Sequence, residues 1–217
     1  TSARDEYPGE KCIFLDANEN PYGKHNRYPD PNHTELKGKL ASIKGINPEN
    51  IVLANGSDEI LDLTFRIFCE PARDKALIFT PTYGMYRQIA AMNDVELIEE
   101  SLDADFQPDE ESMKRIIKRN DLKLIIICSP NNPTGNTIRR DRIDYLLKNF
   151  QGIVLLDEAY IDFCPGNSVL TDLPKHSRLV ILQTFSKAWA LAGARIGAAY
   201  AQSEIIDFYQ RAKAPYN

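Results

Sequence analysis

The chain has 217 residues, 43% of them hydrophobic, which is enough for one large domain with a core of its own. Its formal net charge of −5 at pH 7 argues against the strongly basic surface of a nucleic-acid-binding protein. No apolar run approaches the length of a membrane span, and the first residues lack the apolar region of a signal peptide. We therefore expect neither a nucleic-acid nor a membrane partner.

The cysteines and histidines are scattered and indicate neither a disulfide framework nor a metal site. They are Cys12, Cys69, Cys128 and Cys164, and His25, His33 and His176. The cysteines form no CxxC pair and three lie in or beside apolar segments, so we interpret them as reduced and structural. Reduced cysteines favour the cytoplasm, and a disulfide is the less favoured alternative. The histidines lack the spacing of metal ligands, which argues against a bound metal.

The two ends of the chain suggest one domain preceded by an extended segment. Residues 1–32 are polar and rich in turn-forming residues, and they predict an N-terminal arm. Residues 33–217 predict one large domain. The chain begins without an initiator Met and stops at Lys213-Ala214-Pro215-Tyr216-Asn217 without a helix cap, so we expect this domain to be truncated at its C-terminal end.

Apolar runs typical of strands alternate with helical patterns from residue 33 onward. In chain order the predicted elements are a helix at 33–44, a strand at 51–54, a helix at 57–69, a strand at 75–80, a helix at 83–93, a strand at 96–99, a helix at 109–119, a strand at 122–128, a helix at 139–149, strands at 152–156, 178–183 and 195–200, and a helix at 203–213. Runs such as LIIIC and IVLLD are continuously apolar, as in strands covered on both faces. This alternation predicts a three-layer α/β domain with a largely parallel sheet.

Polar segments follow five of the predicted strands, where open α/β sheets bind their ligands. In chain order they are 54–59 (ANGSDE), 80–86 (TPTYGMY), 129–135 (SPNNPTG), 157–160 (DEAY) and 184–187 (TFSK), the last followed eight residues later by Arg195. Taken singly, each has an ordinary explanation as a helix cap, a tight turn, a salt-bridge partner or a solvated lysine. Core packing is the ordinary explanation for Tyr83 and Tyr86, and for Tyr86 it is the one we adopt.

Together these segments offer every group that a phosphorylated pyridine aldehyde requires. Such a cofactor needs an amine for its aldehyde and a buried carboxylate to keep its ring nitrogen protonated. Its phenolic oxygen needs hydrogen-bond donors, and its ring face needs an aromatic partner. Its phosphate needs a helix N-terminus, hydroxyl groups and an arginine.

The order of these groups closely resembles the fold-type I pyridoxal-phosphate aminotransferases. The matching residues are Gly56, Ser57, Asp58, Tyr83, Asn132, Asp157, Tyr160, Thr184, Ser186, Lys187 and Arg195. Within that superfamily the chain is similar, over essentially its whole length, to the class-II-like family of histidinol-phosphate aminotransferases. The stretches that carry this similarity are 15–21 (LDANENP), 26–31 (NRYPDP), 82–86 (TYGMY) and 157–163 (DEAYIDF).

The resemblance implies a role for each residue. Lys187 would hold pyridoxal 5′-phosphate as a Schiff base and then move a proton between Cα and C4′. Asp157 would pair with the ring nitrogen, Asn132 and Tyr160 would bind the ring oxygen, and Tyr83 would stack on the ring. The phosphate would be held by Gly56, Ser57 and Asp58 through backbone donors, and by Thr184, Ser186 and Arg195. Tyr28 resembles the tyrosine that reaches the neighbouring subunit's cofactor phosphate or substrate, which implies a homodimer.

The implied reaction is transamination between L-histidinol phosphate and 2-oxoglutarate, giving imidazole-acetol phosphate and glutamate in L-histidine biosynthesis. In the family, a small C-terminal domain supplies the arginine for the substrate carboxylate and a basic residue for its phosphate. From the resemblance we expect this chain to lack that domain, and so to contain the residues for cofactor chemistry without much of the substrate pocket.

Three other functions compete with this one. A threonine-phosphate decarboxylase or another fold-type I aminotransferase would share most of the motifs, but the segments Asn18-Glu19-Asn20-Pro21 and Arg27-Tyr28-Pro29-Asp30-Pro31 favour the family above. A non-enzymatic, dimer-forming or regulatory protein could retain the fold, although an intact Lys187 with its partners argues against it. A nucleotide-binding Rossmann domain is contradicted by the absence of GxGxxG after the first strand.

Overall fold

Strands and helices alternate along the chain close to the predicted bounds, over the part that the computed structural model describes, residue 15 and residues 17–216. The strands are β1 (Ile51–Asn55), β2 (Lys75–Thr80), β3 (Glu96–Ser101), β4 (Leu122–Cys128), β5 (Ile153–Asp157), β6 (Leu179–Thr184) and β7 (Ile196–Tyr200). The α-helices are α2 (Thr34–Lys44), α3 (Ser57–Phe68), α4 (Met85–Met92), α5 (Glu110–Ile116), α6 (Arg140–Asn149) and α7 (Ser203–Ala212). Short 3-10 helices are η1 (Pro48–Asn50), η2 (Ile161–Phe163), η3 (Pro165–Asn167), η4 (Leu170–Lys175) and η5 (Ala192–Ala194).

Each predicted strand and helix is present, and the largest difference is the early end of α5. This helix stops at Ile116 instead of 119, because the amide of Arg119 bonds to the carbonyl of Ile116 in a tight turn that leaves the helix. The Arg119 side chain then pairs with Asp121 beside the next strand. Residues 1–14 and 16 of the predicted arm, Cys12 among them, lie outside the described residues.

The described residues form one seven-stranded sheet in the order β1-β7-β6-β5-β4-β2-β3. Strands β3, β2, β4, β5 and β6 run parallel, and β7 is antiparallel to both of its neighbours, β6 and β1. The chain turns back from β6 into β7 through residues 185–195 without a crossover helix, which requires antiparallel pairing. The predicted largely parallel sheet is confirmed, and the C-terminal ends of β1, β2, β4, β5 and β6 meet at one edge.

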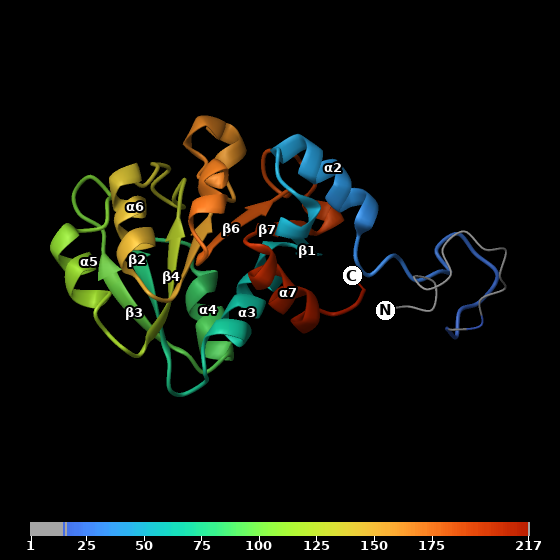
Figure 1. Cartoon of the computed structure of the whole chain (residues 1–217), viewed down its shortest axis with the longest axis horizontal. Helices are drawn as coiled ribbons and strands as arrows, with labels where there is room; N and C mark the ends of the chain where they lie inside the picture. Colours follow the sequence, from blue (N-terminus) through green and yellow to red (C-terminus); the bar gives the residue numbers. More distant parts are fainter. Residues whose placement is uncertain (1–14, 16, 217) are drawn as a thin grey trace.

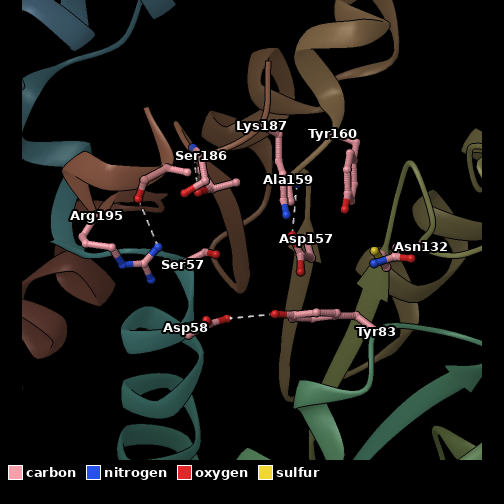
Figure 2. Close-up of a pocket in the computed structure, with 13 residues that line it drawn as sticks. Ser57, Asp58, Tyr83, Asn132, Asp157, Ala159, Tyr160, Ser186, Lys187 and Arg195 are labelled. Atoms are coloured by element: carbon pink, nitrogen blue, oxygen red, sulfur yellow. Dashed lines mark hydrogen bonds between the residues drawn. The ribbon is translucent and has the colours of Figure 1, made fainter. Parts of the chain in front are cut away.

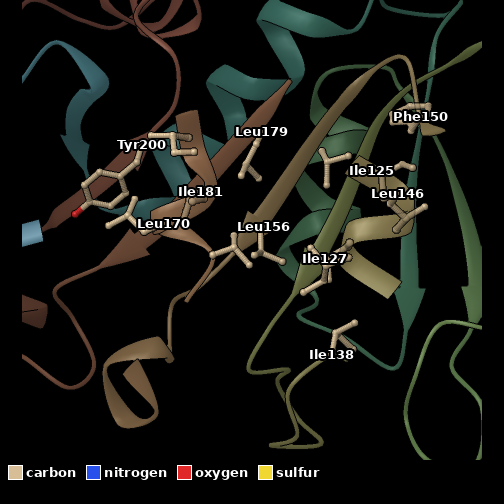
Figure 3. Packing of buried hydrophobic residues seen from close by; sticks show 14 of the residues in the cluster. Ile125, Ile127, Ile138, Leu146, Phe150, Leu156, Leu170, Leu179, Ile181 and Tyr200 are labelled. Carbon is tan, nitrogen blue, oxygen red and sulfur yellow. The ribbon is translucent and has the colours of Figure 1, made fainter. Parts of the chain in front are cut away.

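Helices cover both faces of this sheet, which confirms the predicted three-layer α/β fold (Figure 1). Alternate strand side chains point to opposite faces. One face packs against α2, α5 and α6, and the other against α3, α4 and α7. Figure 3 shows buried side chains on the face covered by α2, α5 and α6. On this face Leu146 of α6 belongs to the same hydrophobic cluster as Ile125 and Ile127 of β4. Each fully buried Leu or Ile stabilises the fold by about 1.5–3 kcal/mol, so the two layers hold the strand ends rigidly in place.

Cys69, Cys128 and Cys164 are free thiols, as predicted. Within the described part of the chain, no helix is both long and apolar enough to cross a membrane.

Candidate active site

A cavity of about 290 Å³ opens at the sheet edge where the strands end (Figure 2). It is lined by Ser57, Asp58, Tyr83, Cys128, Asn132, Asp157, Ala159, Tyr160, Thr184, Ser186, Lys187, Ala192 and Arg195. Ten of the twelve predicted site residues are among them, drawn from five separate strand ends. The two that do not line it are Gly56 and Tyr28.

Lys187 enters the cavity from the connection between β6 and β7. A compact turn fixes this segment: the amide of Ser186 bonds to Oγ1 of Thr184 at 3.2 Å, and the amide of Ala190 bonds to the carbonyl of Lys187 at 3.0 Å. The Lys187 Nζ lies 5.6 Å from the centre of the Tyr160 ring. Figure 2 shows the Lys187 amine and the Asp157 carboxylate directed toward the same space.

Asp157 is the last residue of β5 and is only 4% exposed. Its Oδ2 accepts a 2.6 Å hydrogen bond from the Tyr86 hydroxyl, and its Oδ1 accepts one of 3.0 Å from the amide of Ala159. Burial raises the pKa of Asp157 from 3.8 to about 6, although both hydrogen bonds and the more distant charge of Lys187 oppose the shift. The carboxylate is therefore poorly compensated and suited to a cationic partner inside the cavity.

The raised pKa predicts how the stability of the cofactor-free protein depends on pH. The folded state holds the Asp157 proton more tightly than the unfolded state, so this contribution is fully present below pH about 4 and is lost as pH rises through about 6. We expect the unfolding free energy of the wild type to fall by up to about 3 kcal/mol relative to Asp157→Asn over that range. Urea unfolding of both proteins at a series of pH values measures the difference. A gap that stays constant across these pH values would contradict the raised pKa.

A corner suited to an anion, referred to below as the anion corner, forms where β1 passes into α3. Gly56 precedes the helix with φ of 82°, a conformation that favours glycine, and a Cβ there would lie 2.7 Å from Nη2 of Arg195. Gly56 thus contributes by leaving room for the guanidinium. A Cβ at Gly197 of β7 would lie 2.5 Å from the amide nitrogen of Ser57. The start of α3 therefore packs directly against the backbone of Gly197, where only glycine leaves enough room. The first amides of α3 and Arg195 together offer several donors to an anion.

Asp58 turns its side chain away from this corner. Its Oδ1 accepts a 3.5 Å contact from the Tyr83 hydroxyl, on the opposite side from Arg195 (Figure 2). This orientation is consistent with the predicted backbone role of Asp58. Tyr83 in turn packs edge-on against Tyr86, with ring centres 5.5 Å apart, and burial raises its pKa.

Asn132 and Tyr160 lie on the far side of Lys187 and Asp157 from the anion corner (Figure 2). Tyr160 follows β5 through a turn in which the amide of Ile161 bonds to the carbonyl of Glu158 at 3.0 Å. The neighbouring Asn131 is buried, and its Nδ2 donates to the carbonyl of Pro81 at 2.9 Å. It therefore ties the segment of Asn132 to the segment of Tyr83.

Sequence reasoning missed Asn131 and also Glu158, which is 1% exposed. Glu158 accepts hydrogen bonds from Oγ of Ser168, the amide of Val169 and Nε2 of Gln183, at 2.8, 2.9 and 2.8 Å. These bonds fix the loop that follows Tyr160. The sequence signal for Glu158 is a second carboxylate directly after the apolar run of β5. In the sequence it is recognised only as a member of the segment DEAY, with no role of its own. Tyr86 is fully buried, as predicted, but its hydroxyl bond to Asp157 was not foreseen.

Tyr28 lies outside the cavity. Its side chain is 52% exposed and stacks on Tyr216, with ring centres 4.5 Å apart. A single chain therefore does not bring Tyr28 to the other predicted residues, and its role at a neighbouring subunit stays a prediction.

The cavity fits a phosphorylated pyridine aldehyde in its donor set. The primary amine of Lys187 and the buried carboxylate of Asp157, whose pKa is raised by burial, line the same cavity. Arg195 and the start of α3 form a cationic corner on one side, and aromatic and amide side chains line the other. The fold matches the large domain of fold-type I aminotransferases, and the cavity lies at the strand ends of that fold.

The chain belongs to the family described as aminotransferase class I and II, which matches residues 6–217. This family depends on pyridoxal phosphate. The chain is 50% identical, over 221 aligned residues, to histidinol-phosphate aminotransferase of Bacteroides thetaiotaomicron; the alignment covers 100% of this chain and 63% of that protein.

Solved structures agree with this relationship. The histidinol-phosphate aminotransferase of Clostridium acetobutylicum superposes with a TM-score of 0.80 at 29% identity, covering 88% of this chain and 57% of that one. The enzyme of the same name from Sinorhizobium meliloti, solved in complex with pyridoxal-5′-phosphate, gives 0.79 at 25% identity, covering 87% and 52%. The chain thus spans less than two thirds of the length of each of these relatives.

Proposed function

We propose that the protein binds pyridoxal 5′-phosphate through Lys187 and transfers the amino group of L-histidinol phosphate to 2-oxoglutarate. The products are imidazole-acetol phosphate and glutamate, and the setting is L-histidine biosynthesis. The observation that carries this proposal is the meeting of Lys187, the buried Asp157 and the Arg195 corner in one cavity. The likeness to histidinol-phosphate aminotransferases supports the choice of substrate.

The resemblance implies each proposed role, and the position of the side chain in or beside the cavity supports it. When bound, pyridoxal 5′-phosphate supplies an electron sink for the negative charge left at the substrate Cα after deprotonation. The Lys187 amine would hold the aldehyde carbon until the substrate amine displaces it, and the freed amine would then accept the Cα proton and return it at C4′. Asp157 holds a proton on the ring nitrogen through a charge-assisted contact. Tyr160 and Asn132 donate to the ring oxygen, and Tyr83 covers the ring face.

The phosphate is proposed to sit at the anion corner. The first amides of α3, after Gly56, donate to it, and the guanidinium of Arg195 neutralises part of its charge. Thr184 and Ser186 also line the cavity, and their hydroxyls are proposed to complete the donor set. Free thiols at Cys69 and Cys128 and a biosynthetic role both support the cytoplasm as the proposed location.

A donor screen tests the proposed reaction. The full-length protein, supplied with cofactor and 2-oxoglutarate, is offered L-histidinol phosphate, L-histidinol and L-threonine O-3-phosphate, and glutamate formation is followed. We expect the highest kcat/KM with histidinol phosphate. Release of carbon dioxide from threonine phosphate, without glutamate, would establish a decarboxylase instead. Absence of any turnover with cofactor bound at Lys187 would contradict the reaction but not the cofactor site.

We further propose a homodimer in which Tyr28 of one subunit completes the site of the other. The support is that Tyr28 is exposed and lies away from the cavity of its own chain. Mixing Tyr28→Phe subunits with Lys187→Ala subunits in equal amounts is then expected to restore up to about a quarter of the wild-type activity, because about half of the dimers are hybrids and one of the two sites in each hybrid has both residues. If the subunits exchange and the hybrids stay inactive, Tyr28 does not act across subunits. Each variant incubated with itself is the control.

A further inference from the structure

We infer that Tyr86, a core residue outside the cavity lining, is a positioning residue that orients the Asp157 carboxylate for the ring nitrogen. The inference rests on the proposed function and deepens it. Tyr86 is 0% exposed, and its hydroxyl lies 2.6 Å from Oδ2 of Asp157. A hydrogen bond to a carboxylate at this distance is charge-assisted and among the strong ones.

The two donors to Asp157 fix its plane from different elements. Tyr86 is the second residue of α4 and bonds to Oδ2, whereas the amide of Ala159, just past β5, bonds to Oδ1. Each carboxylate oxygen keeps a lone pair for a further donor. Because Asp157 lines the cavity while Tyr86 lies behind it, the remaining lone pairs are available on the cavity side.

Tyr86 also joins two parts of the proposed ring site. Its own ring packs edge-on against Tyr83, with ring centres 5.5 Å apart and planes at 87°. A single buried side chain therefore contacts both the proposed partner of the ring face and the proposed partner of the ring nitrogen. A shift of α4 would move both together.

The hydroxyl has a direct effect on the charge of Asp157. The ionisable groups that face this carboxylate are Tyr86 from α4, Asp58 from α3, Lys187 from the β6–β7 connection, Cys128 from β4, and Tyr83. Burial raises the pKa of Asp157, and the Tyr86 hydrogen bond is the largest effect that lowers it. Without the hydroxyl, more of Asp157 is protonated near neutral pH and lacks the negative charge that would stabilise a protonated ring nitrogen.

The experiment compares wild type with Tyr86→Phe, which removes one oxygen and keeps the ring. The Asp157 carboxyl is followed by carbon-13 NMR in cofactor-free protein, with its signal assigned by its absence in Asp157→Asn. We expect the titration midpoint of Asp157 to rise by about one to two pH units in Tyr86→Phe. Placing 3-fluorotyrosine, a stronger donor of nearly the same size, at position 86 is expected to lower the midpoint. This second variant serves if Tyr86→Phe does not fold.

Tyr209→Phe is the matched control. Tyr209 is also 0% exposed, and its hydroxyl lies 2.7 Å from Oγ1 of Thr64, within the core and outside the cavity lining. It is expected to lose stability without moving the Asp157 midpoint. An unchanged midpoint in Tyr86→Phe, or equal shifts in both Phe variants, would overturn the inference.

A second measurement tests whether the Tyr86–Asp157 hydrogen bond affects cofactor binding. The probe 4′-deoxypyridoxine 5′-phosphate lacks the aldehyde, so its binding does not depend on Lys187. We expect Tyr86→Phe to bind it about tenfold or more weakly at neutral pH, with a smaller difference in Tyr209→Phe. If wild type binds neither the probe nor pyridoxal phosphate, the proposed function fails while the NMR result still decides the Tyr86 contact. If wild type binds the probe and Tyr86→Phe binds it equally well, the positioning role fails alone.

Discussion

Lys187→Ala is expected to abolish covalent capture of pyridoxal phosphate and to lower turnover by about 10⁴-fold or more. The reason is that one amine has two proposed tasks, binding the aldehyde and moving the Cα proton. Borohydride reduction of the cofactor-loaded wild type, followed by peptide mapping, is expected to place the pyridoxyl group on Lys187. In Lys187→Ala the absorbance band that arises from the covalent bond to Lys187 and the labelled peptide are both expected to disappear.

Lys148→Ala is the control for this prediction. Lys148 is an exposed residue near the end of α6, so its removal should change neither labelling nor turnover. The anion corner stays intact in both variants, and Lys187→Ala should therefore still bind the cofactor noncovalently through Arg195 and the start of α3. A pyridoxyl adduct on a different lysine of the wild type would refute the assignment.

The positions of the strand-end residues could be predicted because the direction of the strands determines at which edge of the sheet each strand ends. Parallel strands direct their C-terminal ends to one edge of the sheet. Asp157 at the end of β5 and Lys187 just after β6 therefore lie at the same edge, on neighbouring strands. The antiparallel β7 brings Arg195 to the same edge, since it begins where β6 ends. Continuous apolar runs identified these strands without information on their neighbours.

Residues whose roles depend on the local backbone could not be predicted in the same way. Asn131 and Asn132 have the same side chain, and the turn geometry decides that the first is buried as a brace and the second lines the cavity. Tyr83 and Tyr86 differ likewise: one lines the cavity, and the other sits behind it with its hydroxyl on Asp157. Such choices follow from torsion angles within a loop, which residue spacing does not reveal.

The sequence of one chain also does not predict which residues contact a second subunit. Tyr28 was assigned from a motif, and one chain leaves it exposed beside Tyr216. Contacts between chains depend on surface complementarity, to which the periodicity of one sequence gives no access.

Asp157→Asn is expected to have opposite effects on stability and on catalysis. The variant keeps the side-chain shape and an oxygen that can accept from Tyr86, but it has no charge to hold a proton on the ring nitrogen. Loss of one charge-assisted contact is expected to weaken cofactor binding by about 1.5–3 kcal/mol. The rate of half-transamination is expected to fall by more than about 10²–10³-fold, since electron withdrawal by the ring is lost along with the contact.

The stability of the same variant is expected to rise near neutral pH in the absence of cofactor. The wild type buries an ionised carboxylate there, and burial raises its pKa to about 6, whereas Asn buries no charge. A site that destabilises its own fold until the cofactor arrives is typical of groups kept for function. Asp74→Asn is the matched control, because Asp74 is a buried aspartate just before β2, at the opposite edge of the sheet.

Asp74 accepts hydrogen bonds from the amide of Glu70 and from Arg73, and its pKa is lowered despite burial. Its replacement should therefore cost stability at neutral pH and leave the rate of half-transamination within about threefold of wild type. Single-turnover kinetics with cofactor-saturated protein and urea unfolding of the cofactor-free protein separate the two effects. If Asp157→Asn were near-normal in single turnover, Asp157 would not be the partner of the ring nitrogen. If it were no more stable than wild type at neutral pH, its carboxylate would be better solvated than its burial indicates.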